Sequence, residues 1–135
     1  MRTRVVSQSA AQDLRHMILV VDDHVDTCEA VSRLLTAAGL SAQYATSGPE
    51  ALELLGTAIP QLILLDIMMP GMSGIELLRL VRTNPRTAGV PVLMMTATSD
   101  ERDLEEAVRL GVKGIIPKGR FDWSHLLDRV RSCMA

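Results

Sequence analysis

The sequence has few cysteines, no long apolar run and no large excess of charge of either sign. Its two cysteines, Cys28 and Cys133, lie far apart and form no CxxC pair, which argues against a disulfide framework or a cysteine zinc site. No apolar run approaches the roughly 18 residues of a membrane span. Residues 1–16 contain arginines but no apolar segment of a secretory signal. We therefore expect a cytoplasmic protein that makes no membrane contact.

The charge and the length of the chain limit its partners and its number of domains. Its 14 basic and 16 acidic residues give a formal net charge of −2, so no overall basic field favours direct binding of nucleic acid. A chain of 135 residues is long enough to bury the core of one domain. We expect residues 1–16 to form a mobile N-terminal extension and residues 17–135 to form that domain.

Short apolar runs alternate with helical patterns from residue 17 onward. Runs such as MILVV and LILL are typical of strands that are buried on both faces of a sheet. A regular alternation of strands and helices favours a parallel sheet with helices on both faces. We predict a doubly wound α/β fold of the (βα)5 type, with strands at residues 17–21, 41–45, 62–65, 92–95 and 112–116.

Recognisable helix starts and stops separate these strands. In the S/T-x-x-E pattern, the hydroxyl and the glutamate side chain each accept a backbone N–H that would otherwise be unpaired. Gly39 and Gly111 are expected to end two of the helices. The expected starts are Asp26 with Glu29, Ser47 with Glu50, Ser73 with Glu76, Thr98 with Glu101, and Asp122 with a hydrophobic staple of Phe121 and Leu126.

Polar side chains end the predicted strands or follow them directly. In an open α/β sheet, ligands bind beyond the carboxyl ends of the strands, near the point where the strand order reverses. Taken alone, each polar residue has a structural explanation, such as a charge at a helix terminus or a solvated loop. Their common position at one edge of the sheet favours a functional site. Its expected members are Asp22, Asp23, Asp66, Thr96 and Lys118.

Three carboxylates dominate the chemistry of such a site. Carboxylates close together repel one another unless a cation compensates them. Oxygen ligands suit a hard cation such as Mg²⁺, which uses one or two carboxylates together with a phosphate. Asp66 is then a candidate nucleophile that forms an aspartyl-phosphate, with Lys118 as a positive charge and Thr96 as a hydroxyl donor for the phosphoryl oxygens. His24, beside the acidic pair, is interpreted as an exposed loop histidine.

The sequence around these residues resembles the receiver domain of two-component response regulators. The matching motifs are VVDDH, LLDIMMPGMSG, MTA and PK, in the family's order and spacing over residues 17 to about 134. The resemblance implies a flavodoxin-like sheet with the strand order 2-1-3-4-5. It also implies that Asp66 accepts a phosphoryl group from a histidine kinase or a phosphotransfer protein.

The resemblance further implies a metal site and an output surface. The Mg²⁺ ligands would be Asp23, Asp66 and the backbone carbonyl of Met68, with Asp22 assisting partly through water. The Pro70–Gly71 turn next to them is expected to need a positive φ at the glycine. The signal would pass to a downstream protein through the face formed by the fourth helix, the fifth strand and the fifth helix.

Two positions depart from the family pattern. Ile115 stands three residues before the lysine, where the family usually has Tyr or Phe, so the usual aromatic switch is absent. Gly119 follows Lys118 where the family usually has proline. We therefore expect the signal to leave through the loop after Thr96 and through Gly119 toward Trp123.

Three functions are compatible with these observations. The first is a single-domain phosphoacceptor that signals by protein contacts and is not an enzyme acting on other substrates; here the chain ends directly after its last helix, with no output domain attached. The second is a receiver excised from a larger hybrid kinase or regulator. The third is an α/β phosphate-ester hydrolase that uses Asp66, although Ile67 and Met68 provide no second acid or base. We favour the first.

Overall fold

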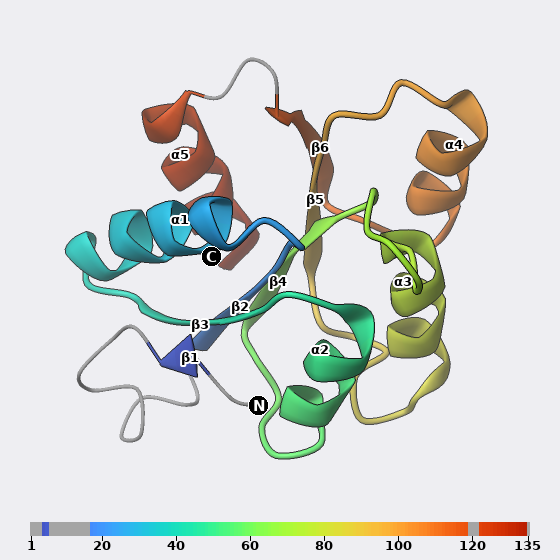
Figure 1. The fold of residues 1–135 in the computed structure, drawn as a ribbon, viewed down its shortest axis with the longest axis horizontal. Helices are drawn as coiled ribbons and strands as arrows, with labels where there is room; N and C mark the ends of the chain where they lie inside the picture. Colours follow the sequence, from blue (N-terminus) through green and yellow to red (C-terminus); the bar gives the residue numbers. More distant parts are fainter. Residues whose placement is uncertain (1–3, 6–16, 119–121, 135) are drawn as a thin grey trace.

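The computed structural model describes residues 4–5, 17–118 and 122–134. These residues form a central sheet with helices packed on both of its faces (Figure 1). Except for Arg4 and Val5, the expected mobile extension at residues 1–16 lies outside the described residues. Phe121, the first residue of the expected staple, also lies outside them.

Six strands form the sheet: β1 (Arg4–Val5), β2 (Met17–Val21), β3 (Ser41–Ala45), β4 (Leu62–Asp66), β5 (Val92–Thr96) and β6 (Gly114–Pro117). Five of them are parallel and follow the order β3-β2-β4-β5-β6. Counted from residue 17, this is the predicted order 2-1-3-4-5, so the predicted fold class is confirmed. β1 was not predicted, and it pairs antiparallel with β3 at the edge of the sheet.

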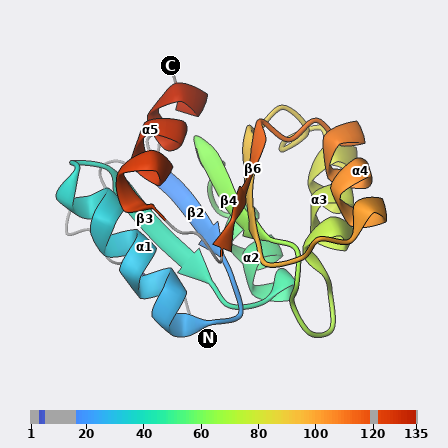
Figure 2. The same cartoon turned by 90° about the horizontal axis from the view of Figure 1, so that it is seen from above.

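The described residues form five helices: α1 (Val25–Ala37), α2 (Gly48–Leu55), α3 (Gly74–Thr83), α4 (Glu101–Arg109) and α5 (Trp123–Met134). The first four connect successive parallel strands, and α5 follows β6. α1 and α5 cover one face of the sheet, and α2, α3 and α4 cover the other (Figures 1 and 2). Within the part of the chain that the structure describes, none of these helices is long and apolar enough to cross a membrane.

The strands pass through the core with both of their faces covered. Every residue of β2, β3, β4 and β5 is buried. In β2, Leu19 packs into the apolar cluster beneath α2, α3 and α4, whereas Ile18 and Val20 pack into the cluster beneath α1 and α5. Full burial of such a side chain contributes about 1.5–3 kcal/mol. This two-sided burial explains why the strands appear in the sequence as unbroken apolar runs.

Three of the predicted helix starts are confirmed, one of them in full. At α5, Asp122 Oδ1 accepts from the His125 N–H at 3.3 Å, as expected of the predicted cap. At α3, Ser73 Oγ accepts from the Glu76 N–H at 3.2 Å, and Glu76 Oε1 accepts from the Ser73 N–H at 2.8 Å. At α2, Ser47 Oγ accepts from the Glu50 N–H at 3.2 Å. The Glu50 carboxylate, however, accepts from the Thr46 N–H at 2.7 Å, so only half of the expected box forms there.

The predicted starts of α1 and α4 are wrong. α1 begins at Val25, so Asp26 lies inside the first turn, where its charge favours the positive end of the helix without capping it. α4 begins after Asp100, whose Oδ1 accepts from the Arg102 N–H at 2.9 Å. Thr98 Oγ1 accepts from the Asp100 N–H at 3.1 Å instead. Aspartate is at least as good a cap as threonine, which is why the later residue takes this position.

α4 is attached to the rest of the fold less deeply than α1. Within its range, all of which is described, Ala107 is the one buried residue, whereas α1 buries four side chains against the sheet: Cys28, Val31, Ser32 and Leu35. Glu106 of α4 forms an ion pair with Arg79 of α3 at 3.2 Å. An exposed pair of this kind contributes at most about 1 kcal/mol. α4 therefore depends on contacts that are individually weak.

Gly74 joins the start of α3 to the end of β4. Its N–H donates to the carbonyl of Ile67 at 2.9 Å. A Cβ at this position would overlap the carbonyl oxygen of Asp66 and lie 2.8 Å from Ile67 Cα. These are backbone atoms that cannot rotate away, so the close approach of helix and strand requires glycine.

We predict that Gly74→Ala lowers the free energy of unfolding by about 2–3 kcal/mol, because an added methyl group must push α3 away from β4. Gly89→Ala is the matched control, since nothing lies within 4 Å of a Cβ there, and its effect should stay below about 1 kcal/mol. Urea unfolding followed by circular dichroism measures both variants. Equal stability of the two variants would contradict the proposed contact.

Candidate functional site

The polar residues predicted from the sequence do meet at the carboxyl edge of the parallel strands. Asp22 and Asp23 follow β2, and Asp66 ends β4. Thr96 ends β5, and Lys118 follows β6. Because neighbouring parallel strands end at the same edge, side chains from four separate segments of the chain converge here.

Lys118 connects two of the carboxylates across the sheet. Its Nζ donates to Asp22 Oδ2 at 2.6 Å and to Asp66 Oδ2 at 3.2 Å. Both aspartate side chains are almost fully buried, with exposed fractions of 0% and 2%, and the lysine side chain is 17% exposed. A buried carboxylate without a compensating cation is strongly destabilising, so this lysine is required by the acidic pair as much as by any chemistry.

The pKa values of the site reflect this arrangement. Burial raises the pKa of Asp66, and the nearby charge of Asp22 raises it further; the Met68 N–H and the Lys118 ammonium act in the opposite direction but do not compensate fully. For Lys118, burial lowers the pKa, but the hydrogen bond to Asp22 and the two negative charges outweigh burial, so its pKa is raised overall. Lys118 is therefore charged at neutral pH.

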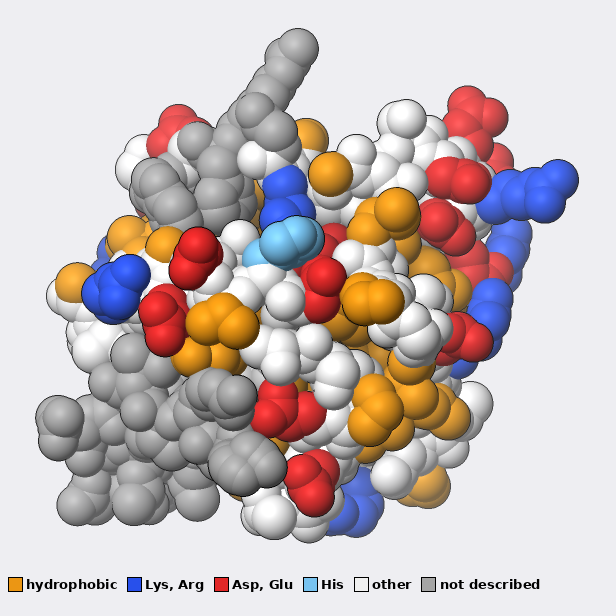
Figure 3. Space-filling view, in the orientation of Figure 1, with side chains coloured by type: hydrophobic (Ala, Val, Ile, Leu, Met, Phe, Trp, Pro, Cys, Tyr) orange, Lys and Arg blue, Asp and Glu red, His pale blue; other side chains and the backbone are white. Residues whose placement is uncertain are grey.

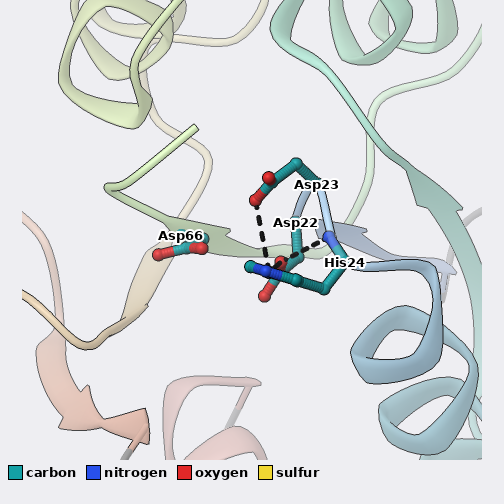
Figure 4. Close-up of side chains that lie close together, drawn as sticks. All are labelled: Asp22, Asp23, His24 and Asp66. Carbon is teal, nitrogen blue, oxygen red and sulfur yellow. Dashed lines mark hydrogen bonds and ion pairs between the residues drawn. The ribbon is translucent and has the colours of Figure 1, made fainter. Parts of the chain in front are cut away.

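Asp23 and His24 form the outer side of the site. Asp23 Oδ1 is buried and accepts no hydrogen bond from any residue that the structure describes. His24 Nδ1 lies 3.4 Å from this atom, within ion-pair distance but without hydrogen-bond geometry, and 3.1 Å from Asp22 Oδ1. Figure 4 shows the imidazole beside both carboxylates, with Asp66 across from them. An unpartnered buried carboxylate oxygen is costly, and a cation would satisfy it.

The sequence predicted an exposed loop position for His24, but it did not predict the contact of its ring with the acidic residues. Its side chain is 65% exposed, as expected of a loop histidine, but the ring nitrogen points at the acidic residues. In the space-filling view, a histidine lies at the surface among acidic side chains with a basic side chain next to it (Figure 3). Its position directly after two aspartates was the one sequence signal for this contact.

The donor atoms fit a divalent cation. One ligand atom from each of Asp22, Asp23, His24 and Asp66 lies within 4.8 Å of all the others. Three of these four donors are carboxylate oxygens, which hard cations prefer. Met68, the other predicted ligand, contacts the site through its backbone: its N–H donates to Asp66 Oδ1 at 3.2 Å. Its carbonyl as a metal ligand stays a prediction.

The residues predicted to carry the signal onward are only partly described. Thr96 is buried, and its hydroxyl oxygen accepts from the Thr98 N–H at 3.1 Å. Ile115 is half-buried and packs against the apolar cluster beneath α2, α3 and α4. Gly119 and the side chain of Trp123 lie outside the described part of the chain. Gly71 has a φ of 75°, as predicted for the turn after Pro70.

Comparison with known proteins identifies relatives of this chain. A family model described as the response regulator receiver domain matches residues 18–131. The chain is 35% identical over 119 residues to the DNA-binding response regulator MtrA of Mycobacterium tuberculosis, covering 88% of this chain and 50% of that protein. It is also 35% identical over 117 residues to the transcriptional regulatory protein CpxR homolog of Haemophilus influenzae, covering 87% and 49%. The chain thus spans about half the length of these curated relatives.

A solved structure shows the same architecture. The chemotaxis protein CheY4 of Vibrio cholerae superimposes with a TM-score of 0.81 at 29% sequence identity. The match covers 88% of this chain and 98% of that chain. The whole sheet-and-helix arrangement, and not one motif alone, is therefore shared.

We predict that Asp66→Asn raises the free energy of unfolding at pH 7 in metal-free buffer, on the order of 1 kcal/mol. The pKa of Asp66 is higher in the folded state than the ordinary value of 3.8, so the folded state holds its proton more tightly. The ionised carboxylate of Asp66 therefore lowers the free energy of unfolding at pH values above its raised pKa, and this loss disappears at pH values below the ordinary pKa. The advantage of the variant should accordingly shrink as the pH falls toward 3.8.

Urea unfolding across this pH range tests the prediction. Asp128→Asn, at an exposed aspartate of α5, is the control and should show no comparable gain at pH 7. A lower stability of Asp66→Asn at pH 7 would mean that Lys118 compensates the carboxylate completely.

Proposed function

Because this chain belongs to the response regulator receiver domain family, a family of signalling domains of two-component systems, we propose that its Asp66 accepts a phosphoryl group from a phosphohistidine. The donor would be a histidine kinase or a phosphotransfer protein. One observation carries the proposal: Asp66 ends a buried strand between a lysine that contacts it at 3.2 Å and an acidic group with an unpartnered carboxylate oxygen. A nucleophilic carboxylate needs a fixed position and positive charge near the phosphoryl oxygens, and both are available here.

The proposed step is a direct phosphoryl transfer. A carboxylate oxygen of Asp66 bonds to phosphorus while the phosphorus–nitrogen bond of the phosphohistidine breaks and leaves its electron pair on the imidazole nitrogen. Lys118 then exchanges its contact with Asp66 Oδ2 for one with a phosphoryl oxygen, while it keeps its shorter contact with Asp22. The hydroxyl of Thr96 donates to a second phosphoryl oxygen. Water later hydrolyses the acyl phosphate and restores the carboxylate.

We propose that Mg²⁺ is bound by Asp23, Asp66 and the Met68 backbone carbonyl, with Asp22 assisting. The ion would neutralise negative charge on the transferred group. The buried, unpartnered oxygen of Asp23 supports this assignment, because it lies among the donor atoms of the site and lacks a proton donor among the described residues.

The signal is proposed to leave through a protein contact. Phosphorylation adds acceptor oxygens beside Thr96, which lies at the start of the loop leading to α4. α4 is weakly anchored, so a shift of this loop can move it without disrupting the core. The face of α4, β6 and α5 is then the surface for a downstream protein. Ile115 of β6 is half-buried and offers no aromatic ring or hydroxyl to report the shift, so we expect a modest change there.

Two alternative functions are a receiver that is part of a longer regulator and a phosphate-ester hydrolase. The lengths of the relatives favour the first of these, and the residues after Asp66 argue against the second. The relatives with DNA-binding in their names are about twice as long as this chain, which supports a role as the receiver part of a longer regulator as the second proposal. A phosphate-ester hydrolase is not favoured, because Ile67 is buried and apolar and Met68 is 55% exposed and apolar, so neither supplies an acid or base. A cytoplasmic location is proposed from the free Cys28 and Cys133.

Asp66→Asn is expected to abolish phosphorylation, because an amide is a poor nucleophile toward phosphorus. Incubation with acetyl phosphate and Mg²⁺, followed by intact-protein mass measurement, should show the phosphorylated form for the wild type only. Asp128→Asn, the exposed control on α5, should be labelled like the wild type. Normal labelling of Asp66→Asn would show that another residue is the acceptor.

Asp23→Ala is expected to remove the stabilisation of the fold by Mg²⁺. A ligand at 100 times its dissociation constant adds about 2.7 kcal/mol to the free energy of unfolding, and this gain should be lost in the variant. Asp26→Ala removes the same charge from an exposed position of α1 and should keep the gain. Thermal unfolding with and without Mg²⁺ measures both variants. An equal Mg²⁺ effect in both would rule out Asp23 as a ligand.

A further inference from the structure

One donor in the acidic cluster is not an oxygen. The imidazole of His24 contributes Nδ1 to the group of ligand atoms that lie within 4.8 Å of one another. Its backbone N–H donates to Asp22 Oδ1 at 2.9 Å, which fixes the residue at the start of α1 with its ring against the carboxylates. Figure 4 shows the ring nitrogen directed at Asp22 and Asp23.

The distances from His24 Nδ1 to the two neighbouring carboxylates match those between adjacent ligand atoms of a metal ion. Asp22 Oδ1 lies 3.1 Å from His24 Nδ1, and Asp23 Oδ1 lies 3.4 Å from it. Around a metal with bonds of about 2.1 Å, adjacent ligand atoms lie about 3.0 Å apart in an octahedron and about 3.4 Å apart in a tetrahedron. Both separations from His24 Nδ1 fall in this interval, as expected if the imidazole and each of these carboxylates bind the same ion.

A proton on His24 Nδ1 does not provide hydrogen bonds to both Asp22 Oδ1 and Asp23 Oδ1. The neutral imidazole carries one N–H and one lone pair, and carboxylate oxygens are acceptors only. A proton on His24 Nδ1 serves Asp22 Oδ1, and Asp23 Oδ1 is left without a hydrogen bond from the described residues. A metal ion between the three atoms would satisfy all of them at once.

We propose that His24 Nδ1 is a metal ligand in this protein, so that its site favours borderline transition-metal ions such as Co²⁺ and Ni²⁺ by more than an all-oxygen site does. Imidazole nitrogen suits these metals, whereas Mg²⁺ prefers oxygen and retains its waters. The inference rests on the metal site of the proposed function and adds a nitrogen donor to it. In this arrangement Lys118 holds Asp22 Oδ2 on the inner side, and the metal binds Asp22 Oδ1 on the outer side.

Metal titrations of the whole chain test this assignment. Affinities for Mg²⁺, Co²⁺ and Ni²⁺ are measured by calorimetry, and the visible absorption of bound Co²⁺ reports its ligands. His24→Asn places an amide oxygen where the nitrogen was, in a residue type that is favoured at helix N-termini, and His24→Ala removes the side chain. His125→Ala is the control for adventitious binding, because His125 is exposed on α5. Circular dichroism verifies the fold of each variant.

In both His24 variants we expect the affinity for Co²⁺ and Ni²⁺ to fall at least about tenfold, and the Co²⁺ absorption to change. The Mg²⁺ affinity should change less than about threefold, and His125→Ala should resemble the wild type throughout. Equal losses for all three ions, or no loss for any, would overturn the role of His24.

These measurements distinguish a failure of the proposed function from a failure of this inference. If the wild type bound Co²⁺ through His24 but did not bind Mg²⁺ and was not labelled on Asp66, the proposed function would fall and the nitrogen ligand would stand. If labelling and Mg²⁺ binding were normal but the His24 variants kept their Co²⁺ affinity and absorption, the proposed function would stand and the inference would fall.

Discussion

The contact of Lys118 with two buried carboxylates is the interaction on which the site depends. Asp22 follows β2 and Asp66 ends the neighbouring β4, and both side chains are almost completely shielded from water. Without a cation between them, their charges would oppose the packing that buries the strands. The lysine follows β6 at the edge of the sheet, 96 residues along the chain from Asp22, so the acidic site is complete only when the strands from β2 to β6 in the sheet order have come together.

Much of this arrangement could be predicted because the fold repeats one simple rule. Strands buried on both faces become unbroken apolar runs, and in a parallel sheet the residue after each run lies at the same edge. Asp66 and Thr96 could therefore be placed together without any knowledge of side-chain contacts. The full capping box at Ser73 and Glu76 was predictable for a similar reason, since both of its hydrogen bonds are local.

The errors arose where several local solutions compete or where contacts are not local. Asp100 and Thr98 are both capable caps, and the preference for aspartate at least equals that for threonine, so the sequence pattern alone did not single out Asp100. The short strand β1 pairs with β3 across a long sequence separation and has too few residues for a pattern. His24 has the exposure of an ordinary loop residue, and only the orientation of its ring, which no sequence pattern encodes, brings Nδ1 to the carboxylates.

Two regions of the molecule differ in how well they tolerate substitutions. Gly74 lies close to the Asp66 carbonyl, whereas α4 is attached shallowly to the rest of the fold. At Gly74, any side chain meets backbone atoms, so no compensating substitution nearby can make room for it. On α4, Ala107 is buried and Leu104 packs against the core, but the exposed positions accept a wide range of side chains at little cost to folding. A domain built in this way can change the exposed side chains of one helix while the geometry around Asp66 stays the same.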